Sequence, residues 1–140
     1  MTVLAEMYET AYLNDIVVDC VKLHKTASLS LMDDDGDCFI ALDPYRLGSE
    51  QNEVLQIAHE LGHCMTGSFY NRYSSLNCIS QKEYRADKWA VHKLIPFSEL
   101  QRAFSEGVVD RWELAERFAV TEAFMETALH VYRREGLLRD

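Results

Sequence analysis

Two histidines four positions apart, with a glutamate directly after the first, occur in the segment QIAHELGHCMTG, residues 56–67. An α-helix turns once every 3.6 residues, so a helix over this segment places His59 and His63 on one face, one turn apart. Two imidazoles in this arrangement can bind a single metal ion. Glu60 borders the same face, where it can reach a water molecule on the metal without being a ligand. Gly62 leaves room for another element to approach. The spacing therefore predicts half of a metal site together with a general base.

A catalytic zinc site usually has three protein ligands and one open position, so a further ligand is required. If that ligand were the last histidine of H-E-x-x-H-x-x-G-x-x-H, it would stand at position 69, with a glycine at position 66. These positions hold Phe69 and Thr66. This observation excludes a metzincin-type site.

The segment SQKEYRADKWA, residues 80–90, offers Glu83 and, one helical turn later, Asp87. Glu83 could complete the ligand set, and Asp87 could accept the second ring N–H of a ligand histidine and so fix that ring. A simpler interpretation also exists, since Ser80 and Glu83 match a capping box and Asp87 could pair with a neighbouring cation. Beside the H-E-x-x-H segment, we favour the ligand interpretation. The other histidines lie outside any ligand spacing, namely His24, His92 and His130.

Periodic apolar residues and capping signals predict a small antiparallel hairpin or sheet near the start of the chain, followed by helices. An acidic turn within residues 32–43 lacks the spaced ligands of a calcium-binding loop and is interpreted as a solvated turn. The expected elements are a helix at 2–14, strands at 16–23 and 28–32, a hairpin over 28–42, a helix from Ser49 to about 66, a loop at 67–79, a helix from Ser80 to before Pro96, a short helix from Ser98 and Gln101 to Gly107, and helices opened by Asp110 with Glu113 and by Thr121, the last ending near Gly136.

Composition places the chain among soluble proteins of one compact domain, because it has 140 residues and 48% hydrophobic residues. No apolar run approaches the roughly 20 residues that span a bilayer. The N-terminal stretch MTVLAEMYETAYLND has no basic region of a signal peptide, so we expect a cytoplasmic protein. The net charge of −9 disfavours direct binding of nucleic acid. The cysteines form no C-x-x-C pair and are predicted to be free thiols, namely Cys20, Cys38, Cys64 and Cys78.

Three segments together resemble the ImmA/IrrE family of metallopeptidases: IAHELGHCMTGSFYN (57–71), EYRADKWAVHKLIP (83–96) and WELAERFAVTEAFM (112–125). The resemblance implies an α+β fold in which a small β-sheet packs beside a mainly helical, zincin-like core, within a single domain over residues 1–140. It implies that one Zn²⁺ per chain is bound by three ligands, that a glutamate serves as the catalytic base and that the acid of the E-x-x-A-D pattern supports the site. The matching residues are His59, His63 and Glu83 for the metal, Glu60 for the base and Asp87 for the supporting acid.

Members of this family act as site-specific proteases on transcriptional repressors, often those of phages and mobile elements. The resemblance therefore implies a protein substrate, hydrolysis of a peptide bond and proton transfer by Glu60. A donor for the developing oxyanion is also needed. The residue types and positions do not select among four candidates: Tyr70, Tyr73, Tyr84 and Arg85.

Three alternatives remain to be weighed. A zinc-stabilised protein could bind a repressor without cutting it, although such a site has no need of Glu60. A peptide deformylase would require a cysteine ligand in a Gly-Cys-Leu context, which Cys20 and Cys38 do not offer. A DNA-binding regulator could use the helix–turn–helix-like segment within residues 98–140, but that segment is net acidic, so we interpret it as a packing unit or a surface for a protein partner. The oligomeric state stays open.

Overall fold

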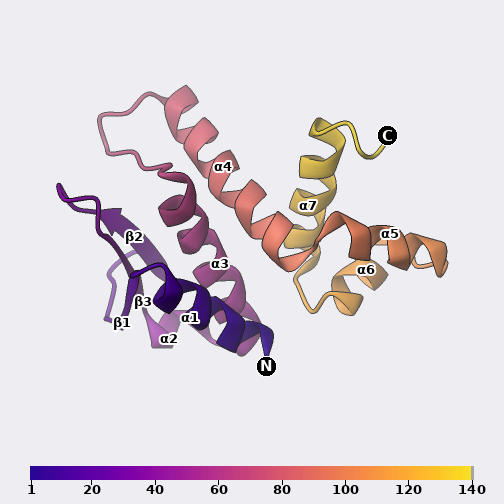
Figure 1. The fold of residues 1–140 in the computed structure, drawn as a ribbon, viewed down its shortest axis with the longest axis horizontal. Helices are drawn as coiled ribbons and strands as arrows, with labels where there is room; N and C mark the ends of the chain where they lie inside the picture. Colours follow the sequence, from indigo (N-terminus) through magenta and orange to yellow (C-terminus); the bar gives the residue numbers. More distant parts are fainter. Residues whose placement is uncertain (140) are drawn as a thin grey trace. The chain divides into compact units, whose positions relative to one another are not determined.

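The computed structural model of the chain describes residues 1–139. In these residues a small sheet and several helices follow one another (Figure 1), which confirms the α+β class. The elements are α1 (Val3–Leu13), β1 (Val17–Cys20), β2 (Ser28–Met32), β3 (Cys38–Leu42), α2 (Pro44–Leu47), α3 (Glu50–Thr66), α4 (Leu76–Leu94), α5 (Phe97–Ser105), α6 (Arg111–Arg117) and α7 (Glu122–Arg134).

The sheet has the strand order β1-β3-β2. The expected hairpin is present, because β2 pairs antiparallel with β3 from Ser28 opposite Leu42 to Met32 opposite Cys38. The sheet as a whole is mixed rather than antiparallel, since β1 pairs parallel with β3 on its other side. The acidic turn between β2 and β3 is closed by hydrogen bonds within the turn. The backbone amides of Asp35 and Asp37 both donate to the side-chain carboxylate of Asp33.

Helix α3 packs on the sheet and presents the histidine-containing segment. Its start is capped as expected, because the Ser49 hydroxyl accepts a hydrogen bond from the Asn52 amide. Gly67 ends the helix with a φ of 65°, a left-handed conformation that glycine adopts without strain. Ile57, Ala58 and Leu61 are fully buried. The apolar face of α3 is therefore fixed against the sheet, which sets the rotation of the whole helix.

Helix α4 passes close to α3 at Gly62. A Cβ atom added to Gly62 would lie 2.4 Å from the Ala86 carbonyl oxygen and 2.9 Å from the Ala86 Cα. A contact this short is possible only without a side chain, which is the role expected of Gly62. It brings the middle of α4 directly against the segment that holds His59 and His63.

Two helices begin at other residues than expected. Helix α4 begins at Leu76, and the Ser75 hydroxyl accepts from the Cys78 amide. Ser80 lies inside this helix, so the capping-box interpretation of Ser80 with Glu83 is wrong. Helix α5 begins at Phe97 after Pro96 without a side-chain cap, so Ser98 is not a cap either. In both cases an earlier residue could start the helix, and the capping pattern fell within the first turns by chance.

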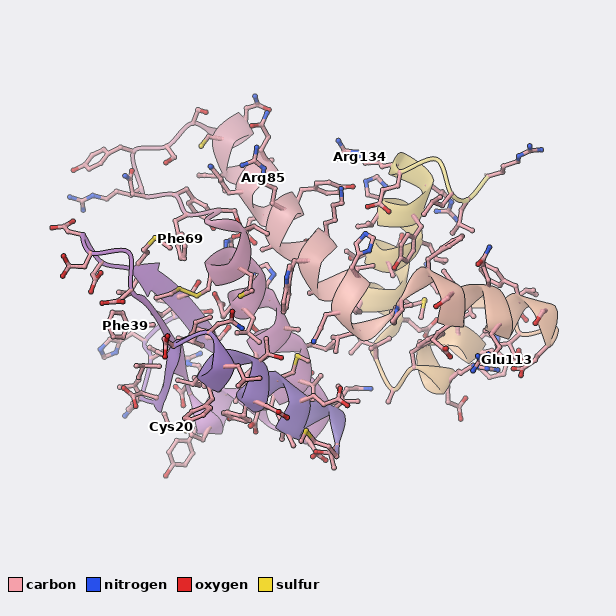
Figure 2. The ribbon with its side chains drawn as sticks, in the orientation of Figure 1. Cys20, Phe39, Phe69, Arg85, Glu113 and Arg134 are labelled. Carbon is pink, nitrogen blue, oxygen red and sulfur yellow. A yellow bond between two sulfur atoms is a disulfide. The ribbon has the colours of Figure 1, made fainter. Side chains whose placement is uncertain are left out.

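The prediction of four free thiols is wrong for two cysteines. Cys38, at the start of β3, forms a disulfide with Cys64 on α3, and their Cα atoms lie 5.9 Å apart. Figure 2 draws this bond in yellow between the sulfur atoms. Cys20 and Cys78 are free. The pairing follows from the packing of α3 on the sheet, which brings together residues separated by 26 positions.

The chain divides into two compact units, one of residues 1–89 and one that begins at Ala90. In the second unit, α6 and α7 follow each other closely, and Ala119 between them has a φ of 55°, the conformation usually taken by glycine in such a turn. The Thr121 hydroxyl caps α7 as expected, whereas Asp110 makes no side-chain cap for α6. The buried Tyr132 donates a hydrogen bond to the Ile95 carbonyl and so ties α7 to the end of α4. That residues 1–140 form one domain stays a prediction.

In the part of the chain that the structure describes, no helix combines the length and apolar character required to cross a membrane.

The close approach at Gly62 generates a stability prediction. Gly62→Ala should lower the free energy of unfolding by about 2 kcal/mol or more, although alanine is the better helix former, because its methyl group meets backbone atoms that cannot turn aside. Urea unfolding of the metal-free protein measures this change. Gln51→Ala, at an exposed position of the same helix, should change it by less than about 0.5 kcal/mol. Unchanged stability of Gly62→Ala would show that the two helices can separate freely.

Candidate metal centre

The structure brings three predicted ligands together in the first unit. His59 and His63 come from α3, Glu83 comes from α4, and one ligand atom of each lies within 4.8 Å of the others. The nearest distances are 2.9 Å from His59 Nε2 to Glu83 Oε2, 3.3 Å from His63 Nε2 to Glu83 Oε1 and 3.2 Å between the two Nε2 atoms. The ring nitrogens and the carboxylate therefore face a common centre.

These distances fit a tetrahedral metal ion. Zinc bonds of about 2.0–2.1 Å in tetrahedral geometry separate neighbouring ligand atoms by roughly 3.3–3.4 Å. The two Nε2 atoms, 3.2 Å apart, are close to that spacing. One Glu83 oxygen lies 2.9 Å from His59 Nε2 and the other lies 3.3 Å from His63 Nε2, so the carboxylate can supply the third ligand atom after a small movement. Two imidazoles and one carboxylate are also a donor set that zinc prefers in catalytic sites. The group can therefore hold a metal ion, with its fourth position open.

The outward ring nitrogens are fixed by hydrogen bonds from two other parts of the chain. His59 Nδ1 donates to Asp87 Oδ1 at 2.9 Å, and His63 Nδ1 donates to the Ser68 carbonyl oxygen at 2.5 Å. Because each Nδ1 carries the hydrogen, each neutral ring directs the lone pair of Nε2 toward the centre. The structure thus places Asp87 where its predicted supporting role requires it. The matching partner of His63, Ser68, was not predicted.

The charges of this group favour protons on the histidines when no metal is bound. Burial lowers the pKa of His59, but hydrogen bonds with Asp87 and Glu83 outweigh it and raise that pKa to about 10. Burial also lowers the pKa of His63, and the bonds with Glu83 and the Ser68 carbonyl raise it on balance. Hydrogen bonds from His59 and His63 hold the pKa of Glu83 well below its usual range. The centre is therefore stabilised by positive charge, which a metal ion or protons can supply.

Glu60 lies beside the centre and is held by the sheet. Its side chain is buried, with 6% of its surface exposed. The Ser30 hydroxyl donates to Oε1 and the Ser28 hydroxyl donates to Oε2, each at 2.7 Å. Both serines belong to β2. Their contact with Glu60 was not predicted, although two serines separated by one residue lie on the same face of a strand.

An open cleft of about 470 Å³ exposes this group to solvent. It is lined by the two histidines, Glu60 and Glu83, by the serines of β2 and by Phe69 and Tyr70 from the loop after α3. Of the four oxyanion candidates, Tyr70 is the one that lines the cleft, and its hydroxyl donates to Glu83 Oε1 at 2.6 Å. That bond and burial raise the pKa of Tyr70 to about 12, so its phenol stays protonated at neutral pH.

Phe69 occupies the position where a metzincin would have its third histidine. Its ring lies beside His63, with ring centroids 5.9 Å apart, and Figure 2 labels it in the loop after α3. The side chain therefore covers one side of the metal group instead of completing it. His92 lies outside the group, since its Nε2 pairs with Glu135 in the second unit.

The raised pKa values predict that metal binding releases protons. At pH 7–8 metal-free His59 still holds a proton that zinc must displace, because its pKa of about 10 lies above this range. Apparent zinc affinity should therefore fall as the pH falls, by about tenfold per pH unit for each proton released. Titration calorimetry in buffers of different ionisation enthalpy counts these protons.

The variant His24→Ala serves as a control, because it removes a histidine that is absent from the ligand group, and it should release as many protons as the unmodified chain. Zinc binding that releases no proton between pH 7 and 8 would contradict the charge distribution described above.

Comparison with known proteins supplies the family. The profile of the IrrE N-terminal-like domain, a peptidase family, matches residues 17–130, which include the sheet, the metal group and most of the helices that follow. No curated protein and no solved structure gives a significant match to the chain. Because the profile covers most of the sequence, the chain belongs to the IrrE N-terminal-like family of peptidases.

Proposed function

We propose that this chain is a zinc-dependent endopeptidase of the gluzincin type, which binds one zinc ion through His59, His63 and Glu83. The observation that carries this proposal is the position of the two Nε2 atoms, 3.2 Å apart and both in contact with the Glu83 carboxylate. Two such nitrogens that both direct lone pairs to one point favour a metal ion or a proton between them. The presence of Glu60 beside them supports hydrolysis rather than a purely structural site.

A zinc ion in this group would supply a Lewis acid that activates water and polarises a peptide carbonyl. The residues of the chain divide the remaining work. Glu60 accepts a proton from the attacking water and delivers it to the leaving amine. Tyr70 has a protonated phenol at the cleft, from which it could donate a hydrogen bond to the developing oxyanion.

An extended peptide is the substrate that the cleft favours. Strand β2 pairs with β3 on one side only, and residues Ser28, Leu29 and Ser30 of β2 line the cleft. A peptide could therefore add to the unpaired edge of β2 and lie across the metal group. The family resemblance suggests a transcriptional repressor of a phage or mobile element as the protein that contains this peptide. The net charge of −9 makes direct contact with nucleic acid unfavourable.

We further propose that the chain acts in the cytoplasm. Disulfides are rare in that reducing compartment. There, reduction of the disulfide would leave Cys38 and Cys64 as neighbouring thiols across the contact between β3 and α3.

The ligand assignment predicts the effect of removing Glu83. Glu83→Ala should lower zinc affinity by more than about 100-fold, because it removes a direct ligand and the negative charge that balances the ion. Metal content after dialysis against a competing chelator measures this loss. Gln81→Ala, at an exposed position on the preceding turn of the same helix, should retain one zinc per chain. Unaltered zinc affinity in Glu83→Ala would mean that another residue is the third ligand.

The role of Glu60 predicts a different result for Glu60→Gln. This variant should retain one zinc per chain but cleave substrate roughly 10²–10⁴-fold more slowly, because the amide cannot accept the proton of water. Suitable substrates are a library of quenched fluorogenic peptides and any transcriptional repressor encoded beside this chain, as the family resemblance implies.

A non-catalytic function is the alternative that this experiment separates. A zinc-stabilised protein that only binds a repressor would leave the repressor intact whether position 60 holds glutamate or glutamine, so neither chain would produce fragments. Equal behaviour of the wild type and Glu60→Gln, with zinc bound in both, would therefore replace the peptidase by the binding protein.

A further inference from the structure

We propose that Ser30 and Ser28 of β2 are positioning residues that hold the Glu60 carboxylate in the orientation required for proton transfer. This inference rests on the proposed peptidase function, and it assigns a role to a strand that lies outside the recognised metal and catalytic segments. The hydroxyls of both serines contact Glu60, whereas the group proposed to bind the metal consists of His59, His63 and Glu83.

The geometry of β2 explains why two serines can reach one carboxylate. Alternate residues of a strand point to the same face, so Ser28 and Ser30 both face α3, while Leu29 lies between them. Their hydroxyls contact different oxygens of Glu60, since Ser30 Oγ lies 2.7 Å from Oε1 and Ser28 Oγ lies 2.7 Å from Oε2. Two bonds to two oxygens fix both the position and the rotation of the carboxylate plane.

The two serines are not equivalent. The Ser28 hydroxyl also lies 2.6 Å from the Gln56 side-chain oxygen, and a hydroxyl has a single hydrogen to donate. Glu60 and Gln56 therefore compete for the hydrogen of Ser28. The Ser30 hydroxyl donates its hydrogen to Glu60 Oε1. Ser30 is thus the donor committed to the carboxylate, and its removal should have the larger effect on the orientation of Glu60.

Helix α3 alone does not fix this orientation. The helix sets the Cα position of Glu60, but three side-chain torsions separate the carboxylate from the backbone, and the last of them is broad. A general base acts efficiently only when the acceptor oxygen lies within hydrogen-bond reach of the proton that it removes. The β2 hydroxyls supply the restraint that the helix lacks.

A simpler role would be to satisfy a buried carboxylate, without any effect on catalysis. The two roles differ in what a Ser30→Ala variant does. Ser30 is partly exposed at the cleft, so water could replace its hydrogen bond and preserve folding. Water would not restrain the orientation of Glu60. Positioning therefore predicts a loss of turnover in a protein that is folded and loaded with zinc.

The test measures steady-state kinetics with a fluorogenic peptide that the wild type cleaves. Ser30→Ala should lower kcat by about tenfold and change KM by less than about twofold, at unchanged zinc content and melting temperature. Ser30→Thr, which retains a hydroxyl on a β-branched side chain suited to a strand, should restore kcat to within about threefold. In the Glu60→Gln background, Ser30→Ala should have no further effect, because the carboxylate that it orients is gone.

Leu31→Ala is the matched control for the strand itself. Leu31 belongs to β2, is 49% exposed and is not among the residues that line the cleft. The kcat of Leu31→Ala should therefore equal that of the wild type. Full kcat in Ser30→Ala, failure of Ser30→Thr to restore it, or an equal loss in Leu31→Ala would each overturn the positioning role.

A readout without metal or substrate separates this inference from the proposed function. The carboxyl-carbon NMR resonance of Glu60, assigned by its disappearance in Glu60→Gln, should shift in metal-free Ser30→Ala and stay in place in Leu31→Ala. An unshifted resonance in Ser30→Ala would overturn the contact itself. Failure of the peptidase function would appear differently, as equal behaviour of the wild type and Glu60→Gln toward every peptide.

Discussion

The contact between Gly62 and the backbone of Ala86 is the constraint on which the metal group depends. On α3, His59 lies three residues before Gly62 and His63 lies one residue after it. On α4, Glu83 and Asp87 lie at the same distances from Ala86. Positions four apart share a helix face, so both pairs flank the point where the helices meet. A side chain at position 62 would move the pair on α3 away from the pair on α4. The four residues are His59 and His63 on α3, and Glu83 and Asp87 on α4.

The same contact explains why the histidine rings have defined orientations. Helix α3 supplies both rings, but the atoms that fix them belong to α4 and to the loop after α3, as Asp87 and the Ser68 carbonyl. Each ring is thereby held with its second nitrogen toward the centre before any ion arrives. In this arrangement the two Nε2 lone pairs and the Glu83 carboxylate all present negative charge to the centre. Positive charge at the centre therefore stabilises the group, and the raised pKa values of the histidines favour protons there in the metal-free chain.

Local patterns in the sequence predicted the parts of the site that depend on helix periodicity. The spacing of His59 and His63, and the turn between Glu83 and Asp87, fixed which residues share a face. Contacts between distant segments left no such pattern in the sequence. The disulfide joins residues 26 positions apart, and β1 pairs parallel with β3 on the side of β3 that faces away from β2. The serines of β2 could have been noticed from their alternation, but nothing in the strand indicates which residue of α3 they meet. Capping patterns misled where an earlier residue could begin the helix, as at Ser75.

The ligand group and Glu60 are held by different neighbours of α3. Helix α4 contacts the ligand histidines, whereas β2 contacts Glu60, the residue between them in sequence. The disulfide between Cys38 and Cys64 joins the sheet to α3 directly beside His63. Helix α3 therefore sets the spacing between Glu60 and the two histidines, while the orientation of each is set by a different neighbour. In the proposed peptidase, metal affinity and proton transfer would therefore be changed separately, through α4 and through β2.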